Sequence, residues 1–248
     1  MVKLSSVLII FVMLSFKAWA GTDVTYQING ETFEGYSAKV VGKPSKGLVF
    51  LVHDWDGLTE YEKKRSDMLV QLGYDAFAVD LFGKGNRPKA IKDRRAATRA
   101  LYKDRKRMLS LLIGGLKEAT KRGPTKTVVI GYCFGGAAAL EIARSGAVQG
   151  IAGYASFHGG LSTPQGQSYP NSTPPIFVAH GGADRAISMD QVSELSKELE
   201  RSKLKYEIQV YSGAPHAFTV FGSKRYREGA DKKSWSALQV FLNETMSR

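Results

Sequence analysis

One stretch of the sequence combines the residue types and the spacing of a reactive nucleophile on a tight turn. Gly131-Tyr132-Cys133-Phe134-Gly135 places a cysteine between two glycines, after a β-branched run at 128–130 and before an alanine-rich segment at 137–144. A strand that enters a helix through so short a turn leaves no room for Cβ atoms beside the nucleophile, which accounts for the glycines. The helix N-terminus favours a thiolate and any oxyanion formed beside it. The pattern predicts Cys133 as a catalytic nucleophile.

A structural role is the alternative interpretation of Cys133, because most free cysteines are small buried hydrophobic residues. Cys133 is the only cysteine of the chain, so a disulfide within one chain is impossible. The predicted strand before the turn and the predicted helix after it favour the catalytic interpretation.

A cysteine nucleophile needs a base, and the base needs an acceptor that fixes its tautomer. When the three residues follow one another along the chain as nucleophile, acid and histidine, the acid is Asp184 and the base is His216. Asp184 follows a predicted strand and two glycines, and His216 lies in a loop after the last predicted strand. The alternatives are that Asp184 caps a helix starting near Ser188 and that His216 is an exposed loop histidine. Four residues are weaker candidates for these roles. His53 and His158 precede Asp184 in the chain, His180 lies at the end of a predicted strand, and Asp190 lies inside a predicted helix.

These side chains need a scaffold that brings distant segments together. Short apolar runs predict strands at 24–27, 32–40, 47–52, 76–79, 128–130, 150–156, 176–179 and 206–211. Helical spacing predicts helices at 61–72, 93–121 (interrupted near Gly114-Gly115), 137–144, 188–201 and 232–244. The alternation predicts an α/β fold with a mostly parallel sheet and helices on both faces. In such sheets the functional sites lie at the C-terminal ends of the strands, where His53, Cys133, Asp184 and His216 all fall.

The first twenty residues have the pattern of a secretory signal peptide. Lys3 precedes an apolar run at 4–16, and Ala18-Trp19-Ala20 is a small-x-small cleavage site before Gly21. An uncleaved membrane anchor is the alternative, but the apolar run is short for a span. We expect cleavage before Gly21, export to a periplasm, one domain at 21–248 and no membrane attachment afterwards.

The chain is strongly basic, with a formal net charge of +12. Removal of residues 1–20 leaves 33 basic and 23 acidic residues, a charge of +10. The basic residues of 93–107 scatter around their predicted helix, which favours a solvated face over a ligand site. No nucleic-acid motif accompanies the charge. We expect no nucleic-acid partner and a monomer; steering of anionic substrates and binding to an anionic surface are the alternatives.

Three motifs in the same order resemble the dienelactone hydrolase family: Gly131-Tyr132-Cys133-Phe134-Gly135-Gly136, Gly181-Gly182-Ala183-Asp184 and Pro215-His216-Ala217-Phe218. The segment at 72–83 is similar to that family as well. The resemblance covers nearly all of residues 21–248. It implies a single-domain α/β-hydrolase fold, a Cys-His-Asp triad of Cys133, His216 and Asp184, hydrolysis of lactones or related esters, and no cofactor or metal.

The resemblance implies further site residues. The family places a carboxylate, usually glutamate, where it can interact with the resting thiol, and Asp54 is the matching residue here. The oxyanion hole would use the backbone N–H groups of Phe134 and Trp55. Members that act on dienelactone carry an arginine shortly after the catalytic histidine, where this chain has Val220. Other cations that would have to replace it are Lys84, Arg87, Arg225 and Arg227.

The sequence therefore predicts acyl transfer through a thioester on Cys133, with a small-molecule ester or lactone as substrate. Amides are poor candidates, because sulfur is a better leaving group than an amine. The alternative from another class is an exported binding protein that keeps the fold without catalysis. A cysteine peptidase is a minor possibility that shares only the triad residue types.

Overall fold

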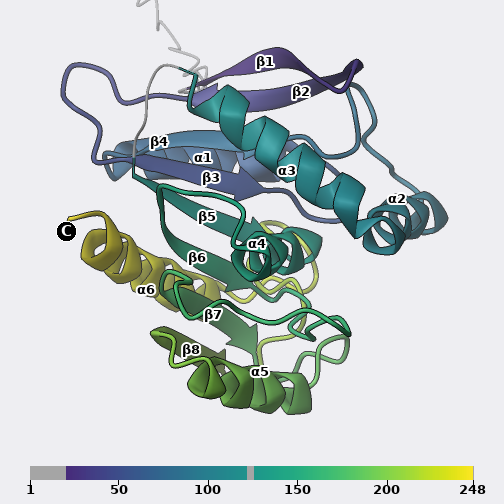
Figure 1. Ribbon diagram of the computed structural model, residues 1–248, viewed down its shortest axis with the longest axis vertical. Coiled ribbons are helices and arrows are strands. Elements are labelled where there is room, and N and C mark those ends of the chain that lie inside the picture. Colours follow the sequence, from purple (N-terminus) through teal and green to yellow (C-terminus); the bar gives the residue numbers. More distant parts are fainter. Residues whose placement is uncertain (1–20, 122–125, 248) are drawn as a thin grey trace, which may run out of the picture.

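A computed structural model describes residues 21–121 and 126–247 of the chain. The predicted signal peptide at 1–20 lies outside the described residues. Within these ranges, eight strands form one sheet in the order β1-β2-β4-β3-β5-β6-β7-β8 (Figure 1). The strands are β1 (Gly21–Ile28), β2 (Glu31–Ala38), β3 (Leu48–Val52), β4 (Asp75–Val79), β5 (Thr127–Tyr132), β6 (Ile151–Phe157), β7 (Ile176–Gly181) and β8 (Tyr206–Tyr211).

The sheet is mostly parallel, as the alternation of strands and helices predicts. The pairs formed among β3 to β8 are all parallel, whereas the β1–β2 and β2–β4 pairs are antiparallel. The β1–β2 hairpin turns through Asn29 and Gly30, which have φ angles of 52° and 80°. Two successive residues with positive φ are what a two-residue hairpin turn requires, so the Asn-Gly signal is confirmed.

The helices of the described residues cover both faces of the sheet. They are α1 (Glu60–Gln71), α2 (Ile91–Lys103), α3 (Arg105–Ala119), α4 (Phe134–Ser145), α5 (Met189–Arg201) and α6 (Glu228–Met246). α1 and α6 pack on one face, and α3, α4 and α5 pack on the other. None of these helices is both long and apolar enough to cross a membrane.

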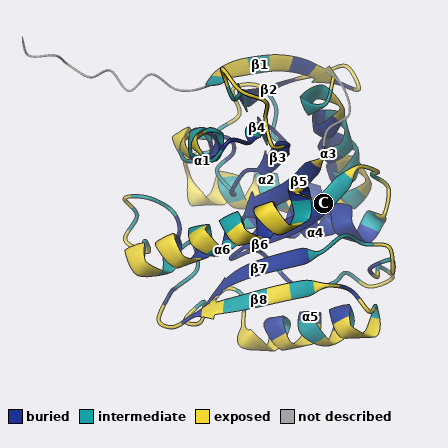
Figure 2. Ribbon diagram, turned by 90° about the vertical axis from the view of Figure 1, so that its left-hand side faces the viewer, coloured by how far each residue is buried: buried dark blue, intermediate teal, exposed yellow. Residues whose placement is uncertain are grey.

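The central strands are buried on both faces, which explains why they appear as continuous apolar runs. In β3, Phe50 and Val52 belong to the core beneath α3 and α4, whereas Val49 and Leu51 belong to the core beneath α1 and α6. Figure 2 shows the same division, with buried central strands between helices whose outward faces are exposed. The sheet therefore gives a rigid base to the loops at its C-terminal edge.

One prediction about the helices is wrong. The long helical segment is interrupted at Asp104, between α2 and α3, and not near Gly114-Gly115. The side chain of Asp104 accepts a hydrogen bond from the Arg107 N–H at 2.9 Å, which caps the start of α3. The two glycines lie inside α3, where added Cβ atoms would stand 2.8 Å from Ile28 and 2.4 Å from Val79. They are there because the helix packs closely on β1 and β4.

Two helix boundaries also differ from the sequence prediction. α4 starts at Phe134, directly after the nucleophile, rather than at residue 137. α6 starts at Glu228 rather than at residue 232, and its first turns carry the buried residue Asp231. A buried carboxylate in a helix that the sequence indicates as amphipathic needs a partner from elsewhere in the fold.

Candidate active site

The turn between β5 and α4 has the shape that the glycines predict. Cys133 has φ 52° and ψ −112°, a conformation that residues other than glycine rarely adopt. A Cβ on Gly131 would lie 2.0 Å from the Gly135 carbonyl oxygen, and one on Gly135 would lie 2.2 Å from the Val52 carbonyl oxygen. Strand, turn and helix therefore approach so closely that both flanking positions require glycine.

The structure brings together the three residues predicted as nucleophile, base and acid. His216 Nε2 lies 3.1 Å from Cys133 Sγ, and His216 Nδ1 lies 2.8 Å from Asp184 Oδ2. The other carboxylate oxygen, Asp184 Oδ1, accepts from the N–H groups of Ala186 at 2.8 Å and Ile187 at 2.9 Å. Asp184 thus stabilises the turn at 184–187 through one carboxylate oxygen and orients His216 through the other. The weaker candidates do not make these contacts.

The charges of the site favour an ionised acid and a protonated thiol. Partial burial opposes ionisation of Asp184, but the hydrogen bond with His216 and those from backbone N–H groups lower its pKa overall. Burial, followed by the neighbouring Asp54 carboxyl, raises the pKa of the Cys133 thiol well above its usual value. The resting nucleophile is therefore a thiol, and ionisation requires a proton acceptor such as the bonded imidazole.

Asp54 lies near the thiol, although it is shorter than the family's usual glutamate. Its carboxyl contributes to the raised pKa of the Cys133 thiol and accepts a hydrogen bond from the N–H of Trp55. Burial, and then the charges of Asp56 and Glu62, raise the pKa of Asp54 well above its usual value. The site thus holds a buried carboxyl that keeps its proton to unusually high pH.

Of the two predicted oxyanion-hole amides, that of Phe134 contacts the nucleophile and that of Trp55 is bonded to Asp54. The N–H of Phe134 points to the Cys133 sulfur, where it opposes part of the effect of burial on the thiol pKa. The N–H of Trp55 donates to the Asp54 carboxyl. A substrate oxygen that binds at the Trp55 amide must therefore displace the carboxyl of Asp54.

Aromatic side chains pack together beside the turn that carries Cys133. The Phe134 ring packs against Phe82 and Tyr102, with ring centroids 5.8 and 5.4 Å apart. Tyr102 thus packs on the residue that follows the nucleophile, and burial, followed by the charge of Cys133, raises the pKa of its phenol. Sequence reasoning missed Tyr102, because it lies in a strongly basic helical segment whose pattern indicates a solvated face.

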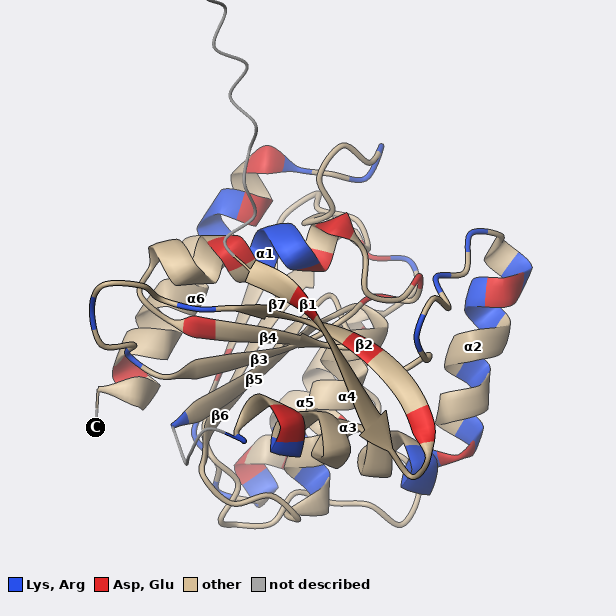
Figure 3. Cartoon of the chain, turned by 90° about the horizontal axis from the view of Figure 1, so that it is seen from above, with Lys and Arg blue, Asp and Glu red and all other residues tan. Residues whose placement is uncertain are grey.

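The prediction that the basic residues of α2 are exposed to solvent is confirmed for most of them. Figure 3 shows Lys and Arg along the helix, and Lys92, Arg95, Arg99 and Lys103 are exposed. Arg94 is different: its guanidinium lies 5.4 Å from the Trp55 ring and pairs with Asp56 at 3.4 Å. The positive charge of Arg94 is therefore already paired with the Asp56 carboxylate.

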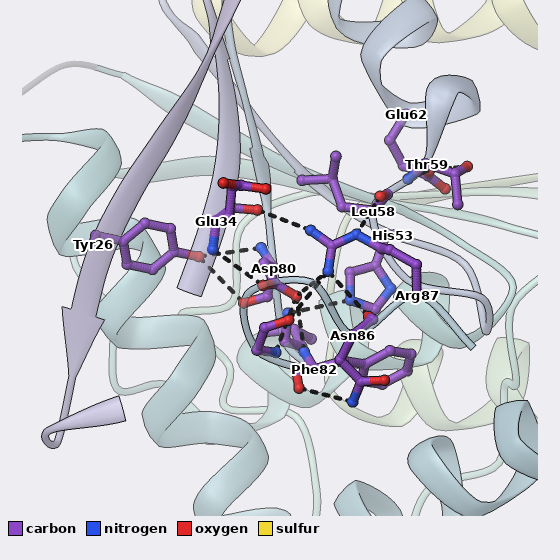
Figure 4. Close-up of polar contacts among 12 residues, drawn as sticks. Tyr26, Glu34, His53, Leu58, Thr59, Glu62, Asp80, Phe82, Asn86 and Arg87 are labelled. Atoms are coloured by element: carbon purple, nitrogen blue, oxygen red, sulfur yellow. Dashed lines mark hydrogen bonds and ion pairs between the residues drawn. The ribbon is translucent and has the colours of Figure 1, made fainter. Parts of the chain in front are cut away.

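Arg87 is not available to hold an anionic substrate in this structure. Its Nε donates to the Leu58 carbonyl at 2.5 Å, Nη1 contacts Asp80 at 3.3 Å, and Nη2 donates to the Glu34 carbonyl at 3.1 Å (Figure 4). The guanidinium thus joins β2, β4 and the loop before α1. Its role is to hold the sheet edge together.

Two other basic residues of the loops, Lys84 and Arg227, also have partners within the protein. Lys84 pairs with Glu34 at 3.2 Å and donates to Thr25 at 2.9 Å. Arg227 donates to carbonyl groups of its own loop at 2.9 and 3.1 Å. In the part of the chain that is described, no group of three His, Cys, Asp or Glu residues could hold a metal ion.

Asp54 provides a test of the site's electrostatics through protein stability. The folded state holds the Asp54 proton to higher pH than the unfolded chain does, so this stabilisation is complete below the usual value of 3.8. It is lost as the pH rises through the raised pKa. Asp54→Asn keeps an acceptor for Trp55 but no longer titrates. We expect the unfolding free energy of the wild type, relative to this variant, to fall as the pH rises above the usual carboxyl pKa of 3.8.

Urea unfolding at several pH values measures that difference. Asp190→Asn is the matched control, because Asp190 is exposed in the first turn of α5, and it should follow the wild type. Parallel pH profiles for the wild type and Asp54→Asn would contradict the raised pKa of Asp54.

Comparisons with known proteins identify the family of the chain. Residues 33–246 match the model of the dienelactone hydrolase family. The chain is 23% identical to the carboxymethylenebutenolidase of Pseudomonas putida, over 82% of this chain and 89% of that protein. It is also 25% identical to Protein usf of Aquifex pyrophilus, over 92% of this chain and 100% of that protein. A dienelactone hydrolase-like promiscuous phosphotriesterase from metagenomic libraries superposes with a TM-score of 0.82 at 26% identity, covering 91% of this chain and 98% of that one. The chain, with its α/β-hydrolase fold and its cysteine on the turn between β5 and α4, therefore belongs to the dienelactone hydrolase family.

Proposed function

We propose that the protein hydrolyses carboxylic esters or lactones through Cys133, His216 and Asp184, with a thioester acyl-enzyme as intermediate. The observation that carries this proposal is the placement of His216, whose two ring nitrogens contact Cys133 Sγ and Asp184 Oδ2. Membership of the dienelactone hydrolase family supports an ester or lactone substrate.

The first half of the reaction acylates the thiol. His216 Nε2 takes the proton of Cys133 while Nδ1–H donates to Asp184, and the sulfur attacks the carbonyl carbon. The carbonyl oxygen becomes an oxyanion that the Phe134 and Trp55 amides bind, each contributing roughly 3 kcal/mol. When the carbon–oxygen bond of the ester breaks, the leaving alkoxide or enolate takes the proton back from His216.

The second half releases the acid. His216 takes a proton from water, and the resulting hydroxide attacks the thioester carbonyl at the same oxyanion-binding amides. The carbon–sulfur bond then breaks, and the thiolate is reprotonated from His216. Asp54 modulates this cycle, because a carboxyl beside the resting thiol keeps it protonated until an acyl oxygen displaces the carboxyl from the Trp55 amide.

We propose uncharged esters and lactones as the preferred substrates. Val220 stands where dienelactone-cleaving members carry a carboxylate-binding arginine, and both Arg87 and Lys84 are engaged in structural contacts. The aromatic side chains of Phe82 and Tyr102 offer apolar surface instead. A substrate carboxylate placed there would lose its hydration without gaining a partner.

Hydrolysis of short-chain p-nitrophenyl esters by residues 21–248 tests the proposal. We expect the wild type to turn over and Cys133→Ala or prior alkylation with iodoacetamide to abolish turnover; Cys133→Ser shows whether the chemistry requires sulfur. Equal rates for wild type and Cys133→Ala would refute the thiol mechanism. A second comparison, of neutral with carboxylate-bearing lactones, tests the substrate class.

A further inference from the structure

The loop that carries His216 is tied down by a buried polar chain that the proposed mechanism does not use. Thr219, three residues after His216, is fully buried, and its Oγ1 lies 2.8 Å from His158 Nε2 and 2.7 Å from the Tyr61 hydroxyl. His158 comes from the C-terminal end of β6 and Tyr61 from α1. Three segments that are distant in sequence thus meet at one threonine hydroxyl.

Arg65 extends this chain on the α1 side, because its Nε–H donates to the Tyr61 oxygen at 3.3 Å. Either hydroxyl can be the donor in the contact between Tyr61 and Thr219. The donor in the contact between Thr219 and His158 depends on the tautomer of the imidazole. Arg65 also binds the Thr219 carbonyl oxygen at 2.9 Å through Nη2. The loop is therefore held through both the side chain and the backbone of one residue.

His158 is placed against the catalytic base at some conformational cost. Its φ of 40° is unfavourable for a residue other than glycine, and such a conformation persists only when its surroundings impose it. The His158 and His216 rings meet edge to face, with centroids 5.4 Å apart. Burial, and then the charge of His216, lower the pKa of His158, while Asp184 opposes and Arg65 reinforces that effect. His216 consequently has an uncharged ring beside it when it becomes an imidazolium.

We propose that His158 and Thr219 are positioning residues for His216. Together they hold the 216–219 loop so that the imidazole faces Cys133 and Asp184 simultaneously. This inference rests on the proposed function, because it assigns His216 the role of base. Small displacements of a catalytic group cost large factors in rate, so removal of the threonine hydroxyl should act on chemistry more than on substrate binding.

The test compares Thr219→Val, which removes the hydroxyl and keeps the branched shape, with Thr219→Ser, which keeps the hydroxyl. We expect Thr219→Val to lower kcat roughly 10- to 100-fold with little change in KM, and Thr219→Ser to retain most activity. Thr245→Val is the matched control, because the Thr245 hydroxyl bonds only carbonyls of its own helix. It should behave as the wild type.

A second readout does not depend on ester turnover. The pH dependence of Cys133 alkylation by iodoacetamide reports how readily His216 accepts the thiol proton. In Thr219→Val we expect its midpoint to rise by about one pH unit, and Thr219→Ser should restore the wild-type midpoint. If no ester is hydrolysed, this shift still establishes the positioning role while the proposed function fails.

The pair should also act as a unit. His158→Phe keeps a ring beside His216 but removes the ring nitrogen that bonds Thr219, so the double variant with Thr219→Val should lose little beyond either single change. Additive losses would overturn the proposal, as would a wild-type alkylation profile in Thr219→Val. Equal losses in Thr219→Val and Thr219→Ser would overturn it too, because the hydroxyl would then not matter.

Discussion

Replacing Asp184 with asparagine is expected to lower kcat for ester hydrolysis by about 10²- to 10⁴-fold, with a small effect on stability. The reason lies in the second carboxylate oxygen. Asp184 Oδ1 accepts from two backbone N–H groups, at 2.8 and 2.9 Å. The oxygen of an asparagine must occupy that position, which turns its NH₂ group toward His216 Nδ1. His216 would then carry its proton on Nε2 and could not accept the proton of Cys133.

Steady-state kinetics with p-nitrophenyl esters, together with thermal unfolding, measure this effect. Asp190→Asn makes the same chemical change at an exposed position of α5, six residues further along the chain, and should leave kcat unaltered. Full activity in Asp184→Asn would show that the contact between Asp184 and His216 does not set the tautomer.

The largest effect on stability is expected at Arg65, whose guanidinium is almost completely buried. It forms an ion pair with the buried Asp231 and lies 4.2 Å from the Phe221 ring and 5.2 Å from the Trp235 ring. Arg65→Met would leave the Asp231 carboxylate buried without its cation. Because an unpaired buried charge is strongly unfavourable, we expect the free energy of unfolding to fall by about 3 to 5 kcal/mol.

Chemical denaturation of three variants separates the buried charge from the loss of packing. Lys63→Met removes a cation from the same helix whose partner, Asp23, is about half exposed (49%), and should cost less than about 1 kcal/mol. Arg65→Met combined with Asp231→Asn should recover part of the loss, because no unpaired charge remains. Equal destabilisation by Lys63→Met and Arg65→Met would contradict this account.

The sequence alone determined the parts of the protein that depend on local steric rules and on periodicity. Gly131 is required by a 2.0 Å approach to the Gly135 backbone within the same turn, so the cysteine turn is visible in the sequence itself. The Asn29-Gly30 turn and the continuous apolar strands are equally local signals. The order of Cys133, Asp184 and His216 is also read from the sequence, through the chain order usual for this fold. Strand β8 has the same bounds, 206–211, in the sequence prediction and in the structure.

Tertiary structure decided how charges and polar groups are paired. Arg87 appears in the sequence as a candidate anion-binding residue, but its donors are taken by Leu58, Asp80 and Glu34, which no spacing rule brings together. Gly114-Gly115 appears as a helix interruption, yet α3 continues through it because the glycines fit against β1 and β4. In each case the partner lies on another element.

The same distinction applies within the candidate site. Sequence order predicts which residues form the triad, but the place of Asp54 near the thiol and the support of the His216 loop by His158 and Thr219 depend on side chains meeting across the fold. His158 appears in the sequence as a histidine in the wrong order to be the base. Its place beside His216 depends on the register of β6 against its neighbours and on the path of the loop after β8. Steric requirements of a turn act over a few residues and are therefore visible in the sequence. The partners of a buried polar group depend on how whole elements pack, which only the tertiary structure reveals.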